Sequence, residues 1–192
     1  MKVENETGLV RLARRVAGGD RGSLDALLRE LEPLVVRTTR LIVGAGSPEA
    51  EDAAQEALLD VARGIHGLRE PEAARAWAIR VATARALKIA RRERLVSLRR
   101  ATLGDFEPAA PPESRRAAAI KEAFDRLPPA MRATAVLRLY IGLSEAETAE
   151  ALECSVGTVK SNLHDARLRL TTALTERGVA PAVSATRVGE IV

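Results

Sequence analysis

The sequence predicts an all-α protein made of two small helical domains, an N-terminal four-helix lobe and a C-terminal helix-turn-helix lobe, joined by a flexible linker. Apolar residues recur at helical spacing along most of the chain, and the 13 glycines and 9 prolines fall mostly between those runs. Aromatic residues make up only 2% of the 192 residues, so the core has to be built from Leu, Val, Ile and Ala. The expected parts are a first domain over 1–95, a linker over 96–114, a second domain over 115–175 and a tail over 176–192.

The N-terminal lobe is expected to contain four helices, over about 9–17, 20–43, 48–65 and 71–96. The first ends at two consecutive glycines, and the second has leucine and valine at helical spacing. Ser47-Pro48 is a strong start signal for the third helix, because an N-cap residue is followed by proline in the first helical position. The connections are short, so neighbouring helices are expected to pack against one another.

The helical pattern fails between about residues 96 and 116, where the apolar residues are scattered. One glycine and three prolines interrupt this stretch, namely Gly104, Pro108, Pro111 and Pro112. Such a composition is typical of a linker. Helices should resume at about residues 113–115, and periodicity is lost again after about Glu176.

The stretch over 143–174 reads as a short helix, a tight turn and a second helix. The first helix has an apolar stripe built from Leu143, Ala146, Ala149 and Leu152. Ser155 is a good N-cap, so the second helix should begin at about Val156. Its inward face is expected to hold Val159, Leu163, Ala166, Leu170 and Leu174. Short polar and basic side chains on its other side suit the major groove of DNA, although spacing alone leaves an ordinary helical hairpin open.

Composition limits the chemistry of the chain. The formal net charge is +4 and the isoelectric point is about 9.8, which permits a polyanionic partner without requiring one. The single cysteine, Cys154, is expected to be a buried structural thiol, and its isolation fits a reducing cytoplasm. His66 and His164 have no nearby Cys or His partners, so we expect no metal site, and the sequence contains no motif for a cofactor or a catalytic nucleophile.

No membrane insertion is expected. No apolar run reaches the length of a transmembrane helix, and Glu4 and Glu6 occupy the positions that the apolar part of a signal peptide would need.

Several motifs resemble one family. The sequence GTVKS at 157–161, followed by a leucine and an Ala-Arg pair, resembles the C-terminal helix-turn-helix of sigma-70 family factors, and in particular the small extracytoplasmic-function sigma factors of bacteria. Upstream of that motif, this chain resembles the helix pair that precedes it in the family, at Arg126-Leu127-Pro128-Pro129, Arg132 and Val136-Leu137-Arg138. Nearer the N-terminus, the chain resembles the family's other domain at Gly19-Asp20, the Glu51–Glu56 segment and Ala76–Arg80. The resemblance covers about residues 9–95 and 115–175 in the family's order.

The third helix is acidic on one face, which holds Glu51, Asp52, Gln55 and Glu56, and no Lys or Arg occurs between residues 48 and 62. A solvated face is the simpler interpretation, and acids in the first turn also favour the helix dipole. In sigma factors the matching Glu-Asp-x-x-Gln-Glu helix docks on the coiled-coil clamp helices of the largest polymerase subunit. The resemblance therefore implies that these four residues contact core RNA polymerase.

The fourth helix is basic, with nine Lys or Arg residues between Arg75 and Arg100 against a single acid, Glu93. At 3.6 residues per turn, one arc gathers Trp77, Arg80, Lys88, Arg91 and Arg92. The far side is expected to face the core with Ile79, Ala82, Ala86, Ile89 and Ala90.

A buried tryptophan is the usual expectation, and the alternative is an aromatic platform beside phosphate-binding cations. That combination suits melting DNA, because a ring stacks on any exposed base while cations neutralise the backbone. In the family this helix reads the −10 promoter element and helps to open it. The resemblance implies −10 contacts from Trp77, Arg80, Arg85, Lys88, Arg91 and Arg92.

For the recognition helix, the resemblance implies contacts with the −35 element from Ser155, Thr158, Lys160, Ser161, Asn162 and Arg167. The chain departs from the family at several of its DNA-facing positions. Ala84 and Lys88 stand where Asn and Asp are typical, and Asn162 and Asp165 stand where Arg is common. Glu153 occupies a turn position that often holds glycine, whose left-handed geometry is costly for other residues.

These observations predict an alternative sigma factor that is not an enzyme and that acts in the bacterial cytoplasm. Its implied partners are core RNA polymerase, promoter DNA and an anti-sigma factor. One rival is a helix-turn-helix regulator that binds duplex DNA alone as a dimer. Another is a sigma-like protein that binds only other proteins.

Overall fold

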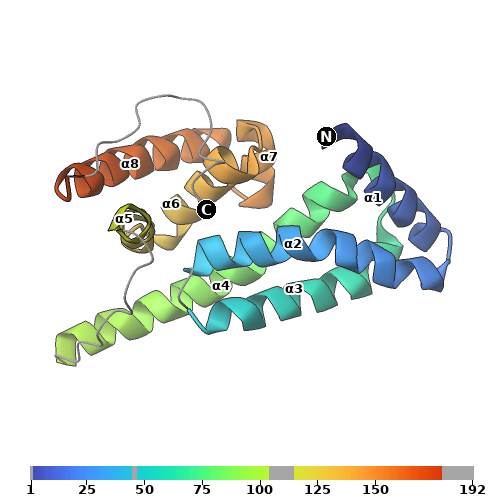
Figure 1. Ribbon diagram of the computed structural model, residues 1–192, viewed down its shortest axis with the longest axis horizontal. Helices are drawn as coiled ribbons and strands as arrows, with labels where there is room; N and C mark the ends of the chain where they lie inside the picture. Colours follow the sequence, from blue (N-terminus) through green and yellow to red (C-terminus); the bar gives the residue numbers. More distant parts are fainter. Residues whose placement is uncertain (1, 45–46, 104–114, 179–192) are drawn as a thin grey trace.

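The computed structural model describes residues 2–44, 47–103 and 115–178, and every regular element in these ranges is helical (Figure 1). The N-terminal lobe consists of α1 (Lys2–Ala17), η1 (Arg21–Ser23), α2 (Leu24–Val43), α3 (Glu49–Gly64), η2 (Ile65–Gly67), η3 (Pro71–Ala73) and α4 (Ala74–Leu103). The C-terminal lobe consists of α5 (Arg115–Asp125), α6 (Pro129–Ala135), the π-helical η4 (Val136–Ile141), α7 (Glu145–Ala151) and α8 (Val156–Thr175). The predicted all-α class with two lobes is confirmed.

Two helix boundaries differ from the sequence prediction. Helix α1 begins earlier than expected, at Lys2, and α4 continues to Leu103 instead of ending near Val96. The extension of α4 has a simple cause, because residues 97–103 contain neither glycine nor proline and the first helix breaker is Gly104. The loss of apolar periodicity therefore does not mark the end of the helix.

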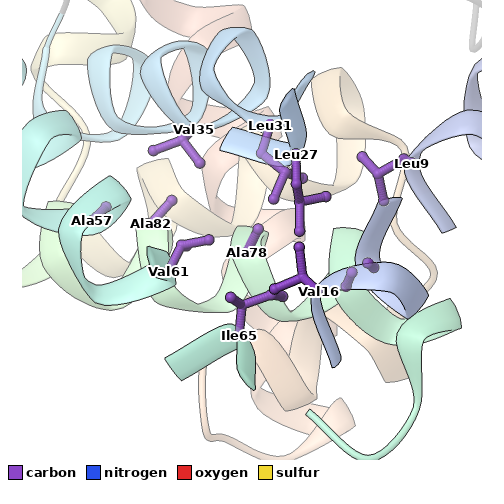
Figure 2. Packing of buried hydrophobic residues seen from close by; sticks show 12 residues of the cluster. Leu9, Val16, Leu27, Leu31, Val35, Ala57, Val61, Ile65, Ala78 and Ala82 are labelled. Atoms are coloured by element: carbon purple, nitrogen blue, oxygen red, sulfur yellow. The ribbon is translucent and has the colours of Figure 1, made fainter. Parts of the chain in front are cut away.

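Helices α2, α3 and α4 pack side by side, and α1 lies against one end of them together with the three short 3-10 turns (Figure 1). Their common core is apolar (Figure 2), and its largest fully buried side chains are Val16, Leu27, Leu31, Val35, Val61 and Ile65. The turn into α2 is held by Asp20, whose carboxylate accepts hydrogen bonds from the Gly22 amide at 3.0 Å and the Ser23 hydroxyl at 2.9 Å.

The C-terminal lobe has a small core of its own between α5, α6 and α8. Its members are Leu127, Ala135 and Ala166, with Phe124, Met131, Leu139 and Leu170 packed around them. The start of α7 is fixed by a capping box, in which the Ser144 hydroxyl accepts from the Glu147 amide at 3.2 Å and the Glu147 carboxylate accepts from the Ser144 amide at 2.7 Å.

The two lobes pack directly against each other, with α6, η4 and α7 over α2 and α4 (Figure 1). One shared apolar cluster includes Ile42, Val43, Ala50, Ala53, Ala86 and Leu87 of the N-terminal lobe and Ala133 and Val136 of the C-terminal lobe. A second cluster joins Ile79 to Leu137, Leu143 and Ala151. Ile79 and Ala86 are therefore buried, as predicted, but against the other lobe and not only against their own helices.

Candidate polymerase and nucleic-acid interfaces

The predicted helix-turn-helix is present as α7, a tight turn and α8. In the turn Glu153 has a φ of 52°, and among the described residues it is the only one other than glycine in the left-handed region. The Cys154 amide donates to the Ala149 carbonyl at 3.0 Å, which satisfies the end of α7. Ser155 caps α8 as predicted, because its hydroxyl accepts from the Thr158 amide at 3.0 Å.

Two details of this motif were predicted wrongly. Ala146 is exposed, and the buried face of α7 includes Thr148 and Ala151 instead. The cause is geometric, since a strict step of three residues drifts by about 60° around a helix with 3.6 residues per turn. Cys154 is only half-buried, because it lies outside α7, just after the left-handed residue of the turn.

The first turns of α8 present most of the predicted −35 residues to solvent. Ser155, Thr158, Lys160, Ser161 and Arg167 are exposed, and Asn162 is half-buried. The Thr158 hydroxyl lies 2.9 Å from that of Ser155, so the cap and the first polar side chain form one unit. Lys160 forms an ion pair within the chain, because its Nζ lies 3.6 Å from the Glu145 carboxylate on α7.

The acidic face of α3 is exposed as predicted, but it is not free of cations in three dimensions. Glu51 pairs with Arg40 of α2 at 2.6 Å, and Glu56 pairs with Arg85 of α4 at 3.1 Å. Asp52, by contrast, is exposed and has no ion-pair partner within the described ranges. The charge that remains available to a partner therefore centres on Asp52.

The cations of α4 divide into two groups. Arg85 faces α3, where its Nε donates to Asp60 at 2.5 Å and its Nη1 donates to Glu56, so it ties two helices together. Lys88, Arg91 and Arg92 are exposed further along the helix. The structure therefore separates Arg85 from the other residues predicted to contact the −10 element.

Arg80 is also engaged within the chain. Its Nη1 lies 3.7 Å from the Glu150 carboxylate on α7, so it pairs with the other lobe. Trp77 is half-buried and packs beside the N-terminal core. The edge of its indole lies against the backbone of Gly64, since a Cβ built there would come within 2.7 Å of Trp77 Cζ2. Trp77 is thus neither fully buried nor a free platform.

A groove of about 810 Å³ lies next to the acidic face, between α2, the start of α3 and η4. Its lining includes Arg37, Arg40, Glu51 and Tyr140, and the Arg37 guanidinium stacks over the Tyr140 ring at 5.6 Å. Sequence reasoning missed this groove because its walls come from both lobes and no single helix shows it.

Comparison with known proteins assigns both lobes. The family model described as Sigma-70 region 2 matches residues 27–96, which span α2 to α4, and the model described as Sigma-70, region 4 matches residues 117–170, which span α5 to α8. The ECF RNA polymerase sigma factor SigM of Mycobacterium tuberculosis is 36% identical over 161 residues, covering 83% of this chain and 80% of the relative. The chain belongs to the extracytoplasmic-function group of the sigma-70 family.

Other members of the family are similar to this sigma factor along most of its length. SigE of Mycolicibacterium smegmatis is 31% identical over 181 residues, covering 88% of this chain and 69% of the relative. Among solved structures, CnrH in complex with the cytosolic domain of CnrY superposes with a TM-score of 0.63 at 19% identity, over 87% of this chain and 97% of that one. RpoE of Bartonella quintana in complex with the anti-sigma factor NepR gives a TM-score of 0.63 at 20% identity, over 79% of this chain and 96% of that one. These two structures support the fold.

Within the described parts of this sigma factor, no helix is both long enough and apolar enough to cross a membrane. The same residues contain no group of three or more His, Cys, Asp or Glu side chains arranged to hold a metal ion.

Proposed function

We propose that this chain acts as an alternative sigma factor, which joins core RNA polymerase in the bacterial cytoplasm and directs transcription initiation at specific promoters. The observation that supports this most strongly is the presence of regions 2 and 4 in order, together with 36% identity to a named sigma factor over most of both chains. Sigma factors act as initiation factors and not as enzymes. An anti-sigma factor is the expected regulatory partner, as in the RpoE complex with NepR.

The polymerase contact is proposed for the acidic face of α3, with Asp52 at its centre. Asp52 and Gln55 are exposed and face outward between the two flanking ion pairs of Glu51 and Glu56. Because Arg40 and Arg85 already neutralise the flanking acids in part, Asp52 should contribute most of the attraction to a basic surface. Arg85 is then a positioning residue for this face and not a DNA contact.

The DNA contacts are proposed for two exposed basic surfaces. Lys88, Arg91 and Arg92 of α4 would neutralise phosphates near the −10 element. Arg80 and Trp77 lie on the same helix and would contact the same element. The start of α8 would enter the major groove at the −35 element with Thr158, Lys160, Ser161 and Asn162, and Arg167 would reach the backbone further along.

A gel shift with promoter DNA, with and without core polymerase, tests the function. A sigma factor should shift the DNA only when core is present. A shift by the chain alone would favour the helix-turn-helix regulator, and no shift under either condition would favour the protein-binding rival.

Charge reversal tests the polymerase surface. Asp52→Lys should weaken core binding by about 2–5 kcal/mol if the charge is desolvated in the contact, and by much less if it lies at the rim. Asp52 is a better position than Glu56, whose reversal would also break the pair with Arg85. Glu30→Lys, an exposed acid on α2, is the matched control and should leave affinity unchanged. Equal affinity of a folded Asp52→Lys variant would remove the polymerase role from this face.

A further inference from the structure

The helix-turn-helix of this chain is poor in cations. Lys160 is the only Lys or Arg between residues 139 and 166, a range that covers α7, the turn and the first half of α8. The same range contains five acids, namely Glu145, Glu147, Glu150, Glu153 and Asp165. Proteins that bind DNA usually neutralise phosphates with several cations. A single lysine therefore supplies the positive charge of this motif, and a group that pairs with it has a direct effect on DNA binding.

Glu145 of α7 forms an ion pair with this lysine. Its Oε2 lies 3.6 Å from Lys160 Nζ, and the Glu145 side chain is 38% exposed and the Lys160 side chain 63% exposed. Helical geometry agrees with this contact, because Lys160 lies about 60° around α8 from buried Leu163, whereas Ser161 lies about 160° from it. Lys160 is thus at the edge of α8 that faces α7, and Ser161 is on the outermost side.

This edge is where a helix-turn-helix meets the DNA backbone. In such motifs the first helix crosses the backbone, and the start of the second helix lies in the major groove. An ammonium group at the edge between the two helices can therefore reach a phosphate. The Glu145 carboxylate is an anion in the same place, and two anions that share one ammonium group repel each other. Phosphate binding has to displace the carboxylate or overcome that repulsion.

The other carboxylates of α7 have different partners. Glu147 forms the capping box with Ser144, and Glu150 pairs with α4. Within the part of the chain that the structure describes, Glu145 is the only acid of α7 at ion-pair distance from Lys160. Its replacement by glutamine also leaves the two hydrogen bonds of the capping box in place. The pair can therefore be broken without removing the cap of α7.

We propose that Glu145 is a positioning residue, which holds Lys160 away from the DNA backbone and so sets the strength of −35 binding. Its carboxylate competes with a phosphate for one ammonium group, and the affinity for the −35 element is lower than the contacts of α8 alone would give. This inference rests on the proposed function, and it adds a residue of α7 that acts on DNA through α8. Exposed ion pairs contribute little energy, so removal of this one should change affinity by about two- to fivefold.

Fluorescence anisotropy of the holoenzyme on promoter DNA over a salt series tests the competition. Glu145→Gln should raise affinity by about two- to fivefold at low salt. It should also steepen the slope of log K against log salt by up to about one unit, because an unpaired Lys160 neutralises one phosphate more completely. In a Lys160→Ala background, Glu145→Gln should change neither quantity. A purely structural effect on α7 would alter binding whether or not Lys160 is present.

Glu153→Gln is the matched control. It removes the same charge from the turn of the same motif, where Glu153 is exposed and has no ion-pair partner among the described residues. Any gain from Glu153→Gln should be the same with Lys160 and with alanine at that position, since it reports only general repulsion between acids and DNA. The gain from Glu145→Gln should require Lys160.

Binding of the labelled chain to core polymerase, measured first and without DNA, separates the two proposals. Absence of core binding would contradict the proposed function, and this inference with it. If core binds, three results would overturn the inference alone. These are no gain from Glu145→Gln, an equal gain with and without Lys160, and unchanged DNA affinity of the Lys160→Ala holoenzyme.

Discussion

The Ser47 hydroxyl lies 2.5 Å from Glu93 Oε1, which joins the connection between α2 and α3 to the middle of α4. The same hydroxyl lies 2.8 Å from Glu49 Oε2. A hydroxyl has one proton for two carboxylates, so the group is fully hydrogen-bonded only when one carboxyl holds a proton. Burial raises the pKa of Glu93, and the neighbouring Glu49 raises it further. Of the two carboxyls, the one acid in the basic stretch of α4 is therefore the one that takes up a proton at the higher pH.

Glu93 should make the stability of the protein fall as the pH rises. Its pKa is higher in the folded chain than its ordinary value of 4.5, so its contribution is complete below pH 4.5 and is lost as the pH rises through the folded pKa. Glu93→Gln should remove this loss. The gain in stability of the variant over the parent should therefore be larger at pH 7 than at pH 4. Urea denaturation at a series of pH values measures the difference.

Glu49→Gln is the matched control for Glu93. The pKa of Glu49 is lowered, chiefly by the Ser47 hydroxyl, so its contribution is present above its unfolded pKa and is lost as the pH falls. The two variants should therefore change the slope of stability against pH in opposite directions. Equal slopes for both variants and the parent would show that the two carboxyls do not share a proton.

Gly64 and Trp77 offer a test of how firmly the indole is held. A Cβ at Gly64 would lie 2.7 Å from Cζ2 and 2.8 Å from Cη2, so Gly64→Ala must displace the ring. Overpacking of this kind costs about 1–3 kcal/mol. The only tryptophan should also shift its emission to longer wavelength as it gains solvent. In a Trp77→Ala background, Gly64→Ala should cause no loss of stability. The same loss in that background would show that the new methyl group does not clash with the indole ring.

Glu153 and Gly142 both have positive φ but differ in side chain. Glu153→Gly should stabilise the protein by up to about 1 kcal/mol, because the left-handed region costs an L side chain about 1–2 kcal/mol while glycine loses more backbone entropy. Gly142→Ala, at a φ of 82° with open space around it, should destabilise the protein by a similar amount. Thermal denaturation of both variants gives the signs, and equal signs would contradict the conformational explanation.

Local signals in the sequence predict the helices and the Ser155 cap well, and partners between helices poorly. The start of α3 lies one residue later than Ser47-Pro48 predicts, with Pro48 and not Ser47 at the N-cap position. Ser155 was identified from residue type and position alone, because a cap acts on amides two or three residues away. Arg85 is a −10 contact only by the family resemblance, since helical spacing leaves it outside the arc of Trp77 and the other cations, and no local pattern shows that Asp60 lies opposite it. Ile79 was expected in its own lobe for the same reason. The apolar periodicity of one helix does not predict which residues of other helices it contacts.

Asp165 is the clearest departure from a phosphate-binding surface on α8, one turn beyond Ser161. Asp165→Arg should strengthen promoter binding by the holoenzyme and steepen its salt dependence by about one unit in the slope of log K against log salt, as expected for one added phosphate contact. Glu176→Arg makes the same charge change at the far end of the helix and should leave the slope unchanged. Fluorescence anisotropy over a salt series measures both.

Asn162 should determine base preference at the −35 element and not the salt dependence of DNA binding. An asparagine in the first turns of a recognition helix can pair with an adenine edge, which discriminates against other bases by about 1–3 kcal/mol. Asn162→Ala should therefore relax the preference at one −35 position while the salt slope stays the same, since no phosphate contact is lost. Asn162 is half-buried where Thr158 and Ser161 are exposed, so its reach to a base depends on how deeply α8 enters the groove. If Asn162→Ala leaves base preference unchanged and Asp165→Arg leaves the salt slope unchanged, α8 does not lie in a groove, and the protein-binding rival accounts better for this lobe.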